Sequence, residues 1–224
     1  MSDELIVEQI QIGPMQNFTY IVGSKSTREV AIVDPAWDIP ELIEQINAKD
    51  YKLTAALVTH YHPDHIGGSI GGHDIEGIAQ LLETQSVKIY THKAEADGVK
   101  RVTGVSESDL VRVESGDDLK LGDISVEFLH TPGHTPGSQC FRIKNTLVSG
   151  DTLFINGCGR VDLPGSDYED MYHSIQKHAA LPEENLLLPG HNNAHVPNAT
   201  MGETKKVNNY MNVKDLDSWK LFMG

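Results

Sequence analysis

The sequence predicts a layered α/β fold in a single domain that spans residues 1–224. Apolar runs of strand length alternate along the chain with segments whose apolar residues repeat at helical spacing. No internal repeat or low-complexity linker divides the chain. Its length, and the 39% of its residues that are hydrophobic, suffice for one sizeable core.

The first part of the chain predicts strands that end at turns, with one helix among them. Glycine or proline closes each apolar run of the opening third. Residues 38–50 place Ile39, Leu42 and Ile46 on one helical face, with Asp38 as the N-cap. The strands are expected at residues 5–13, 18–23, 29–35 and 54–59.

The remainder of the chain continues the alternation of strands and helices. Residues 166–181 predict a strong helix, in which Ser166 and Glu169 form a capping box. Residues 93–118 are polar and mixed, and indicate a short helix within an excursion. Further strands are expected within 87–92, 124–134, 138–145, 146–151 and 185–191, and further helices at 74–84 and 203–212.

The acidic balance of the chain argues against polyanionic partners. With 32 acidic and 18 basic residues, the formal charge is −14, which repels nucleic-acid backbones and anionic lipid. The N-terminal MSDELIVEQI lacks the basic and apolar regions of a secretory signal, and no run approaches the ~20 apolar residues of a membrane span. We therefore expect a cytoplasmic protein that acts on a small molecule, with no nucleic-acid or membrane partner; nothing in the sequence fixes its oligomeric state.

A cluster of metal-binding residue types follows the fourth predicted strand, in the motif THYHPDH. His60 and His62 are two residues apart, so in extended backbone they point to the same side and can hold one ion. Pro63 favours a turn or helix start, which carries Asp64 and His65 round to a neighbouring position. One loop thus offers ligands to two metal sites about 3.5–4 Å apart.

Three more candidate ligands stand at the ends of later predicted strands. The segments EFLHTPGH, LVSGD and LLLPGH each end an apolar run at a turn, and they place His134, Asp151 and His191 at the junctions. Loops beyond the strand ends form the binding crevice of α/β folds. We expect these residues to converge with the histidine-rich loop on one metal cage.

Together these motifs resemble the metallo-β-lactamase superfamily. THYHPDH, PGHTPGS, SGDTLF and LPGH follow the order of that family's H-x-H-x-D-H motif and its later His, Asp and His ligands. The resemblance implies a four-layer αβ/βα sandwich, in which two mixed β-sheets pack face to face with helices outside. It also implies a first metal site made of His60, His62 and His134. The second metal site would consist of Asp64, His65 and His191, and Asp151 would be the carboxylate that bridges the two.

The implied cofactors are two divalent metal ions, expected to be zinc, with iron and manganese as alternatives. Ions that share Asp151 would also share a water, whose pKa they would lower toward neutrality. The same ions polarise a carbonyl group, so no serine or cysteine nucleophile is needed, and no G-x-S-x-G motif is present. Asp64 and Asp151 are the expected catalytic residues, Asp64 by orienting the water or accepting its proton.

The segment that begins at Asp151 resembles the glyoxalase II branch of the superfamily. SGDTLFINGCGRVDLPGSD implies a thioesterase of hydroxyacylglutathione or similar thioesters, in which metal-bound hydroxide attacks the thioester carbonyl. Arg160 stands where that branch places a basic residue for the glycine carboxylate of glutathione. Asp162 replaces the expected tyrosine, and NNAH replaces the aromatic residue after His191, so glutathione is one candidate among thiol carriers.

The same segment also resembles the persulfide dioxygenases, which share GCGR with a following aspartate. That resemblance implies a single Fe(II) held by His60, His134 and Asp151, a two-histidine, one-carboxylate set with positions open for oxygen and sulfur. Glutathione persulfide would then be oxidised to sulfite. A non-catalytic metal-binding module is a third alternative; it would need lost ligands, whereas all the expected ligands are present.

Overall fold

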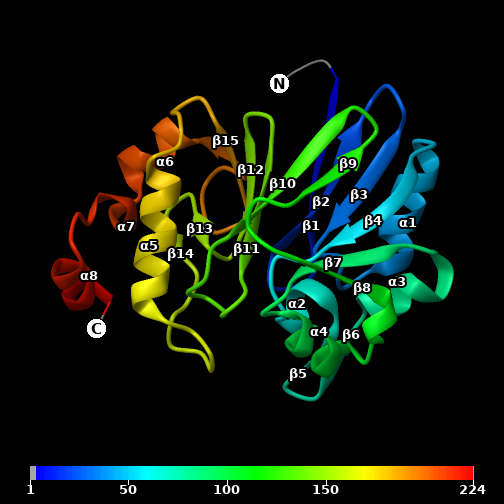
Figure 1. The fold of residues 1–224 in the computed structure, drawn as a ribbon, viewed down its shortest axis with the longest axis horizontal. Helices are drawn as coiled ribbons and strands as arrows, with labels where there is room; N and C mark the ends of the chain where they lie inside the picture. The colour runs from blue at the N-terminus through cyan, green and yellow to red at the C-terminus, as the bar shows by residue number, and fades with distance from the viewer. Residues whose placement is uncertain (1–3, 224) are drawn as a thin grey trace.

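Two β-sheets packed face to face form the centre of the molecule, with helices on both outer faces (Figure 1). This computed structural model describes residues 4–223. Within that range each of the two large sheets has six strands, and two short hairpins stand apart from them. These layers confirm the αβ/βα sandwich that the sequence motifs imply.

The first sheet is built from the N-terminal half of the chain. Its strands are β1 (Leu5–Ile12), β2 (Asn17–Ser24), β3 (Glu29–Val33), β4 (Lys52–Leu57), β7 (Lys88–His92) and β8 (Leu110–Val113). They pair in the order β1-β2-β3-β4-β7-β8. β1, β2 and β3 are antiparallel, whereas β3, β4, β7 and β8 run parallel. The carboxyl ends of the parallel strands therefore meet at one edge of the sheet, where the histidine-rich loop follows β4.

The second sheet is built from the C-terminal half. Its strands are β9 (Asp118–Leu121), β10 (Ile124–His130), β11 (Gln139–Ile143), β12 (Thr146–Gly150), β15 (Leu186–Pro189) and β16 (Ala199–Thr200). They pair in the order β16-β15-β12-β11-β10-β9, with only β12 and β15 parallel among the described strands of this sheet. The two hairpins are β5 (Gly68–Ile70) with β6 (His73–Ile75), and β13 (Leu153–Phe154) with β14 (Gly157–Cys158).

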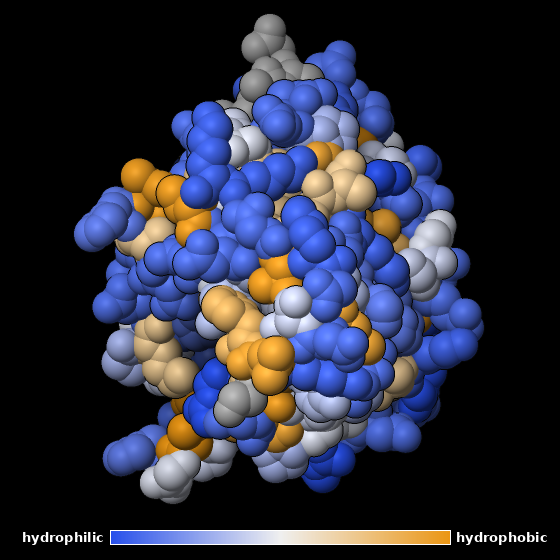
Figure 2. Space-filling view, turned by 90° about the vertical axis from the view of Figure 1, so that its left-hand side faces the viewer, coloured by the Kyte–Doolittle hydropathy of each residue, from blue (hydrophilic) through white to orange (hydrophobic). Residues whose placement is uncertain are grey.

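The helices flank the sandwich. They are α1 (Ile39–Ala48), α2 (Pro63–Ile66), α3 (Ile78–Thr84), α4 (Ala96–Thr103), α5 (Tyr168–Ala179), α6 (Met201–Val207), α7 (Asn209–Asn212) and α8 (Leu216–Met223), with a 3-10 turn at Glu107–Asp109. Helices α5 to α8 lie together on the outer side of the second sheet (Figure 1). Their outer surface is mostly polar, with separate apolar patches (Figure 2). Between residues 4 and 223, no helix has the length and hydrophobicity needed to cross a membrane.

Three apolar clusters hold these layers together. The central cluster fills the space between the sheets and includes Phe128 and Phe141. A second cluster, which includes Leu42, packs helices against the first sheet, and a third, which includes Met171 and Trp219, packs helices against the second. Burial of such side chains contributes about 1.5–3 kcal/mol each. The layers therefore fix the strand ends from which the functional loops leave.

Local capping chemistry decides two of the helix starts. α1 begins after Asp38, whose carboxylate accepts a hydrogen bond from the backbone N–H of Glu41 at 3.0 Å, as the sequence predicts. The predicted capping box of α5 is wrong in its first residue. Asp167 is the N-cap, because its carboxylate accepts from two backbone N–H groups of the first turn. The Ser166 hydroxyl donates instead to a carbonyl of the preceding turn.

The predicted helix at 74–84 starts too early. Residues 68–75 form the β5–β6 hairpin, and the helix begins only at Ile78. Gly71 and Gly72 join the two strands with positive φ angles of 60° and 84°. A two-residue hairpin turn needs positive φ at both positions, which glycine adopts without strain. The glycine pair is the turn of a hairpin whose second strand includes Asp74 and Ile75, the first residues of the expected helix.

The predicted C-terminal helix at 203–212 is divided in two, and a further helix follows it. Asn208 ends α6 and caps α7. Its side-chain amide also donates to two backbone carbonyls of the β13–β14 hairpin, at 2.8 and 2.9 Å. This contact with a distant hairpin fixes the break. α8 was not predicted, and it contributes the fully buried Trp219, whose indole N–H donates to the Tyr168 carbonyl at 2.7 Å.

Candidate metal centre

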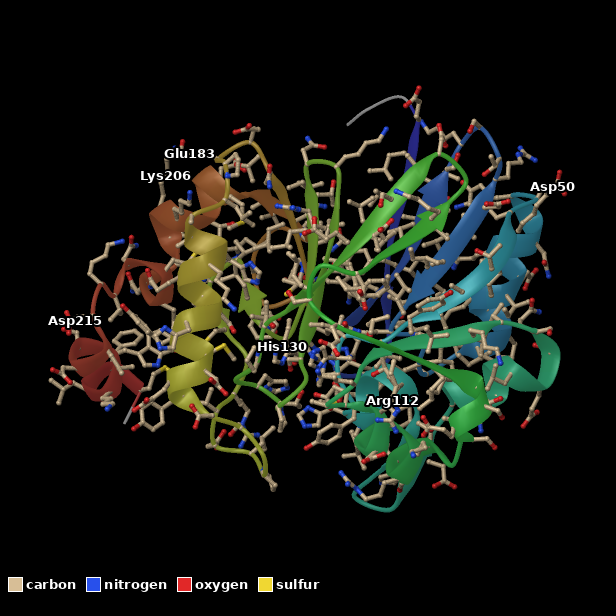
Figure 3. The ribbon with its side chains drawn as sticks, in the orientation of Figure 1. Asp50, Arg112, His130, Glu183, Lys206 and Asp215 are labelled. Atoms are coloured by element: carbon tan, nitrogen blue, oxygen red, sulfur yellow. The ribbon has the colours of Figure 1, made fainter. Side chains whose placement is uncertain are left out.

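The loops after four strands converge at one edge of the sandwich and bring all the expected ligands together. The loop after β4 and helix α2 supply four of these residues, and the loops after β10, β12 and β15 supply one each. His130, labelled in Figure 3, is the last residue of β10, and His134 follows it in the loop. Segments more than 100 residues apart in sequence therefore meet at one place, as the sequence predicts.

The first cluster consists of His60, His62 and His134, each of which offers a nitrogen within 4.8 Å of the others. His62 Nδ1 lies 3.0 Å from His134 Nε2. His62 is in extended conformation directly before α2, so it points to the same side as His60, two residues earlier. His60 and His134 are buried, and His62 is half-buried. Three imidazoles are thus directed at one point.

The second cluster consists of Asp64, His65 and His191, whose ligand atoms also lie within 4.8 Å of one another. His65 Nε2 is 3.2 Å from His191 Nε2, and each of these atoms lies 3.4 Å from Asp64 Oδ2. Pro63 occupies the first turn of α2, and this turn carries Asp64 and His65 away from the first cluster. One short loop therefore serves both clusters.

Asp151 lies between the two clusters. Its Oδ2 is 3.6 Å from His134 Nε2 and 3.3 Å from His191 Nε2. Its Oδ1 is 3.4 Å from His65 Nε2. One buried carboxylate therefore faces histidines of both clusters, the position that a bridging ligand would occupy.

Two buried atoms of the site show that the residues fit metal ions. His60 Nε2 and Asp151 Oδ1 have no hydrogen-bond partner anywhere in residues 4–223. An unpaired buried polar atom costs about 1–3 kcal/mol, and a divalent cation would satisfy both of these acceptors. Imidazole nitrogens and carboxylate oxygens are also the donors that zinc prefers. The donor set and the unpaired atoms therefore agree.

Comparison with known families places the chain in one of them. The profile of the metallo-beta-lactamase superfamily matches residues 12–191. The chain belongs to the metallo-β-lactamase superfamily. This superfamily comprises metal-dependent hydrolases and relatives that bind zinc or iron, and the motifs that first suggest it lie in the matched region.

Relatives within the superfamily carry different activities in their names. The chain is 32% identical to the probable polyketide biosynthesis zinc-dependent hydrolase BaeB of Bacillus velezensis, over 88% of this chain and 83% of that protein. It is 34% identical to hydroxyacylglutathione hydrolase of Tolumonas auensis, over 82% of this chain and 65% of that enzyme. It is 32% identical to human mitochondrial persulfide dioxygenase ETHE1, over 85% of this chain and 70% of that protein.

Solved structures of the superfamily have the same fold. ETHE1 from Myxococcus xanthus superposes with a TM-score of 0.81 at 25% identity, covering 97% of this chain and 89% of that one. The protein TTHA1623, solved in a di-iron-bound form, superposes with a TM-score of 0.73 at 28% identity, covering 90% of this chain and 98% of that one. An ETHE1 protein and a protein that binds two iron ions therefore share the fold of this chain.

Hydrogen bonds from outside the site fix the orientation of the histidine rings in this superfamily member. His134 Nδ1 lies 2.8 Å from the Arg160 carbonyl, and His191 Nδ1 lies 3.0 Å from the Met15 carbonyl. A carbonyl only accepts, so both rings carry their proton on Nδ1. The Nε2 lone pairs consequently point into the site, the arrangement common to metal-binding histidines.

Asp34 fixes the orientation of two more histidine rings of the site, and the sequence analysis did not identify it. Its carboxylate accepts from Thr59, through the backbone N–H at 2.7 Å and the hydroxyl at 2.5 Å, and lies 3.0 Å from His65 Nδ1. Because the Thr59 hydroxyl gives its proton to Asp34, it accepts from His60 Nδ1, 3.0 Å away. The strand-end position of Asp34, in VDP after β3, is the same pattern that identified the ligands and could have revealed it.

Asn17 is a second residue that the sequence analysis missed. Its amide N–H donates to Asp64 Oδ2 at 2.9 Å, and its amide oxygen accepts from the Trp37 indole at 3.1 Å. The indole thus fixes the amide orientation, which in turn fixes the Asp64 carboxylate. No local pattern in the first strands indicates this contact across 47 residues.

Burial favours the neutral, metal-binding form of two histidines in the first cluster. Burial, with nearby His65 and His134, holds the pKa of His60 well below its usual range. Burial, with nearby His134, lowers the pKa of His62 to about 4. Burial raises the pKa of Asp151, but the positive charges of His65 and His191 outweigh it and hold that pKa well below normal. Neutral imidazoles and an ionised carboxylate are the forms that bind cations, and His60, His62 and Asp151 are in these forms. Nearby carboxylates outweigh burial and raise the pKa of His65 and His191, so binding of a cation at the second cluster would displace protons.

Changing Asp34 to asparagine is expected to weaken metal binding by about 10- to 100-fold, the usual effect of losing a carboxylate that supports metal-binding histidines. Asparagine keeps the size of the side chain and tolerates the positive φ of 48° at this position. Competition against a chromophoric chelator would measure the affinity. Asp170→Asn, on the exposed side of α5, is the matched control, and an Asp34→Asn protein with unchanged affinity would contradict the role given to Asp34.

A cavity of about 430 Å³ opens over the two clusters. Met15, Phe154, Cys158 and Leu163 contribute to its walls, and Arg160 lies at its rim. The Arg160 side chain is 67% exposed, and its guanidinium makes two hydrogen bonds of 2.8 Å to the Asp162 carboxylate. The structure therefore places Arg160 in the lining of the cavity over the metal clusters, already paired with an anion.

Proposed function

We propose that the chain is a thioesterase that uses two divalent metal ions. In this proposal Asp151 bridges the ions and Arg160 contacts the substrate. The remaining ligands are His60, His62 and His134 for one ion, and Asp64, His65 and His191 for the other.

The position of Asp151 carries this proposal. A carboxylate within 3.3–3.6 Å of histidines from both clusters suits a pair of ions that act on one substrate. When bound, such a pair supplies Lewis acidity, which makes hydroxide available near neutral pH and offsets the negative charge that develops on a carbonyl oxygen. A thioester is hydrolysed by that chemistry without a protein nucleophile.

Asp64 is the proposed acid–base residue. The Asn17 amide donates to its Oδ2, and this hydrogen bond leaves Oδ1 as the freer oxygen. Asp64 also lines the cavity over the metal clusters, so it can orient the attacking water or accept its proton. The Asn17–Trp37 contact holds the carboxylate in place during that transfer.

The named relatives support two ions and a hydrolytic reaction. Hydroxyacylglutathione hydrolase is a thioesterase by its name, and BaeB is named as a zinc-dependent hydrolase. TTHA1623, whose structure holds two iron ions, supports occupation of both sites. We propose zinc as the native metal, with iron or manganese as alternatives.

A change of Asp162 to asparagine is expected to lower KM for S-lactoylglutathione by about twofold to fivefold, the range for one exposed ion pair. Asp162 now competes with any substrate carboxylate for Arg160, and its neutralisation would free the guanidinium. Steady-state kinetics at low salt would detect the change, with Asp170→Asn as the control. An unchanged or higher KM would show that Arg160 does not bind the carboxylate of glutathione.

A second candidate function is persulfide dioxygenation with a single Fe(II). The similarity to ETHE1 from Myxococcus xanthus, over 97% of this chain, favours it. His60, His134 and Asp151 would hold the iron as a two-histidine, one-carboxylate set. The same residues serve the two-ion proposal, so the ligands by themselves fit both reactions.

One paired assay separates the two candidates. Protein whose metals have been counted is given S-lactoylglutathione in one cuvette, and glutathione persulfide with an oxygen electrode in another. Thioester cleavage with about two ions per chain is the expected result. Oxygen uptake with one iron per chain, and no thioester cleavage, would replace the hydrolase proposal with the dioxygenase.

A further inference from the structure

A second cavity lies beside the cavity over the metal clusters. Its volume is about 520 Å³, and its apolar walls come from Ile155, Ala194, Val196 and Val207. We call this cavity, with these four residues, the lateral groove. Three polar residues complete its lining, and the residues that line it include no Asp, Glu, Lys or Arg. The groove thus lacks the acidic residues that give the chain its net charge of −14.

The lateral groove continues the cavity over the metal clusters. Asn193 lines both. Phe154 lines the metal cavity, with its ring 6.1 Å from the His191 ring, and the next residue, Ile155, lines the groove. The groove therefore opens on the His191 side of the centre. Arg160 lines only the cavity over the metal clusters. That cavity is therefore partly basic, whereas the lateral groove has no arginine or lysine.

Hydrogen bonds hold the two walls of the lateral groove in place. On one wall, the Asn208 amide pins the β13–β14 hairpin to the end of α6. On the other, the loop that follows His191 is tied to β1, because Gln9 donates to the Pro197 carbonyl at 2.7 Å and accepts from Asn198 at 2.8 Å. The groove is thus formed before any ligand arrives, which reduces the entropy cost of binding.

The apolar walls of the lateral groove are open to solvent and therefore accessible to a ligand. Val196 is 48% exposed and Val207 is 53% exposed. Apolar side chains that line an uncharged hollow beside a reactive centre are characteristic of ligand-binding sites. An occupant of matching chemistry is a hydrocarbon chain joined to a group that reaches the metal clusters.

We propose that the lateral groove binds the acyl chain of the substrate, which is a thioester of a medium-length aliphatic acid. The inference rests on the proposed thioesterase function. The thiols that carry acyl groups in cells contain amides and charged groups, so they suit the polar side near Arg160. The hydrocarbon of the acyl group suits the groove, and the carbonyl between them then lies over the metal clusters.

The first test compares acetyl and octanoyl thioesters of N-acetylcysteamine, a thiol without a carboxylate. Each methylene that is fully buried on binding is expected to raise kcat/KM by about fourfold, and each one held in an open groove by about twofold. From acetyl to octanoyl, kcat/KM is therefore expected to rise at least tenfold. Val207→Asp is expected to remove most of that preference. Leu221→Asp changes an apolar residue of α8 that is 87% exposed and is expected to keep it.

Two outcomes of this test would overturn the inference while hydrolysis itself is retained. One is equal kcat/KM for the two thioesters, or a preference that Val207→Asp leaves intact. The other is found with S-octyl thioacetate, in which the long chain lies on the thiol. If the octyl chain of this compound raises kcat/KM as much as the octanoyl chain of octanoyl-N-acetylcysteamine does, and Val207→Asp removes that increase, the groove binds the thiol arm instead.

A binding measurement keeps the groove testable without catalysis. The octanoyl and acetyl ketone analogues, in which CH2 replaces sulfur, are titrated into metal-loaded protein by calorimetry. The octanoyl analogue is expected to bind at least tenfold more tightly, and Val207→Asp to abolish the difference. If no thioester is hydrolysed but this difference is found, the thioesterase proposal fails and the groove assignment stands; equal binding would overturn the groove assignment.

Discussion

Changing Asp151 to asparagine is expected to lower thioester turnover by more than about 100-fold, the upper end of the loss seen when only a supporting residue of a metal site is changed. The carboxylate faces both clusters, with Oδ1 near His65 and Oδ2 near His134 and His191. An amide of the same shape retains one acceptor oxygen but no charge. The repulsion between two neighbouring cations would then be uncompensated, so metal affinity should fall at both clusters.

The measurements for Asp151→Asn are metal content after gel filtration, turnover with S-lactoylglutathione and the melting temperature. Metal content is expected to fall below one ion per chain while the protein stays folded. Asp170→Asn tests for any general effect of removing a carboxylate. Wild-type turnover in Asp151→Asn protein with two bound ions would contradict the bridging role.

The seven candidate ligands could be predicted because their pattern is local to each strand end. Each apolar run fixes a strand, and the histidine or aspartate after it lies in the loop at the strand's carboxyl end. The only further assumption is that such loops converge, and this is a general property of α/β layers. The β5–β6 hairpin shows the limit of local pattern, because a helix was expected from residue 74, whereas Asp74 and Ile75 pair as a strand with Ser69 and Gly68.

The supporting residues of the site could not be predicted because their roles arise from contacts between distant segments. Asn17 meets Asp64 only when β2 lies beside α2. The break between α6 and α7 has the same origin, since Asn208 bonds to a hairpin some 50 residues earlier in the chain. The uncharged character of the lateral groove likewise depends on three separate segments that meet only in the fold.

Electrostatics explain why an acidic protein can bind an electron-rich substrate at this edge. The net charge of −14 is spread over the whole chain, whereas two divalent ions would place a large positive charge inside one small cavity. Local charges dominate at short range, because screening limits distant ones to about 8 Å at physiological salt. An acidic surface would therefore disfavour polyanions without preventing the proposed hydrolysis of a small thioester.

Changing His62 to alanine is expected to reduce thioester turnover by more than about 100-fold, again exceeding the effect of a supporting residue. Burial holds the pKa of His62 at about 4, so the neutral ring is available as a ligand at pH 7. Its removal leaves the first cluster with His60 and His134, while the second cluster is intact. Metal content should therefore fall from about two ions per chain to about one. His173→Ala, on the exposed side of α5, is the matched control.

The His62 variant also discriminates between the two candidate reactions, because the iron set of a dioxygenase does not include this residue. His60, His134 and Asp151 remain in His62→Ala protein, and a single Fe(II) bound by them would still be held. If the two-ion thioesterase proposal is right, His62→Ala abolishes thioester cleavage and shows no oxygen uptake with glutathione persulfide. If iron content and oxygen uptake match those of the unaltered chain, the ion in the first cluster does not depend on His62, and the two-ion arrangement is contradicted.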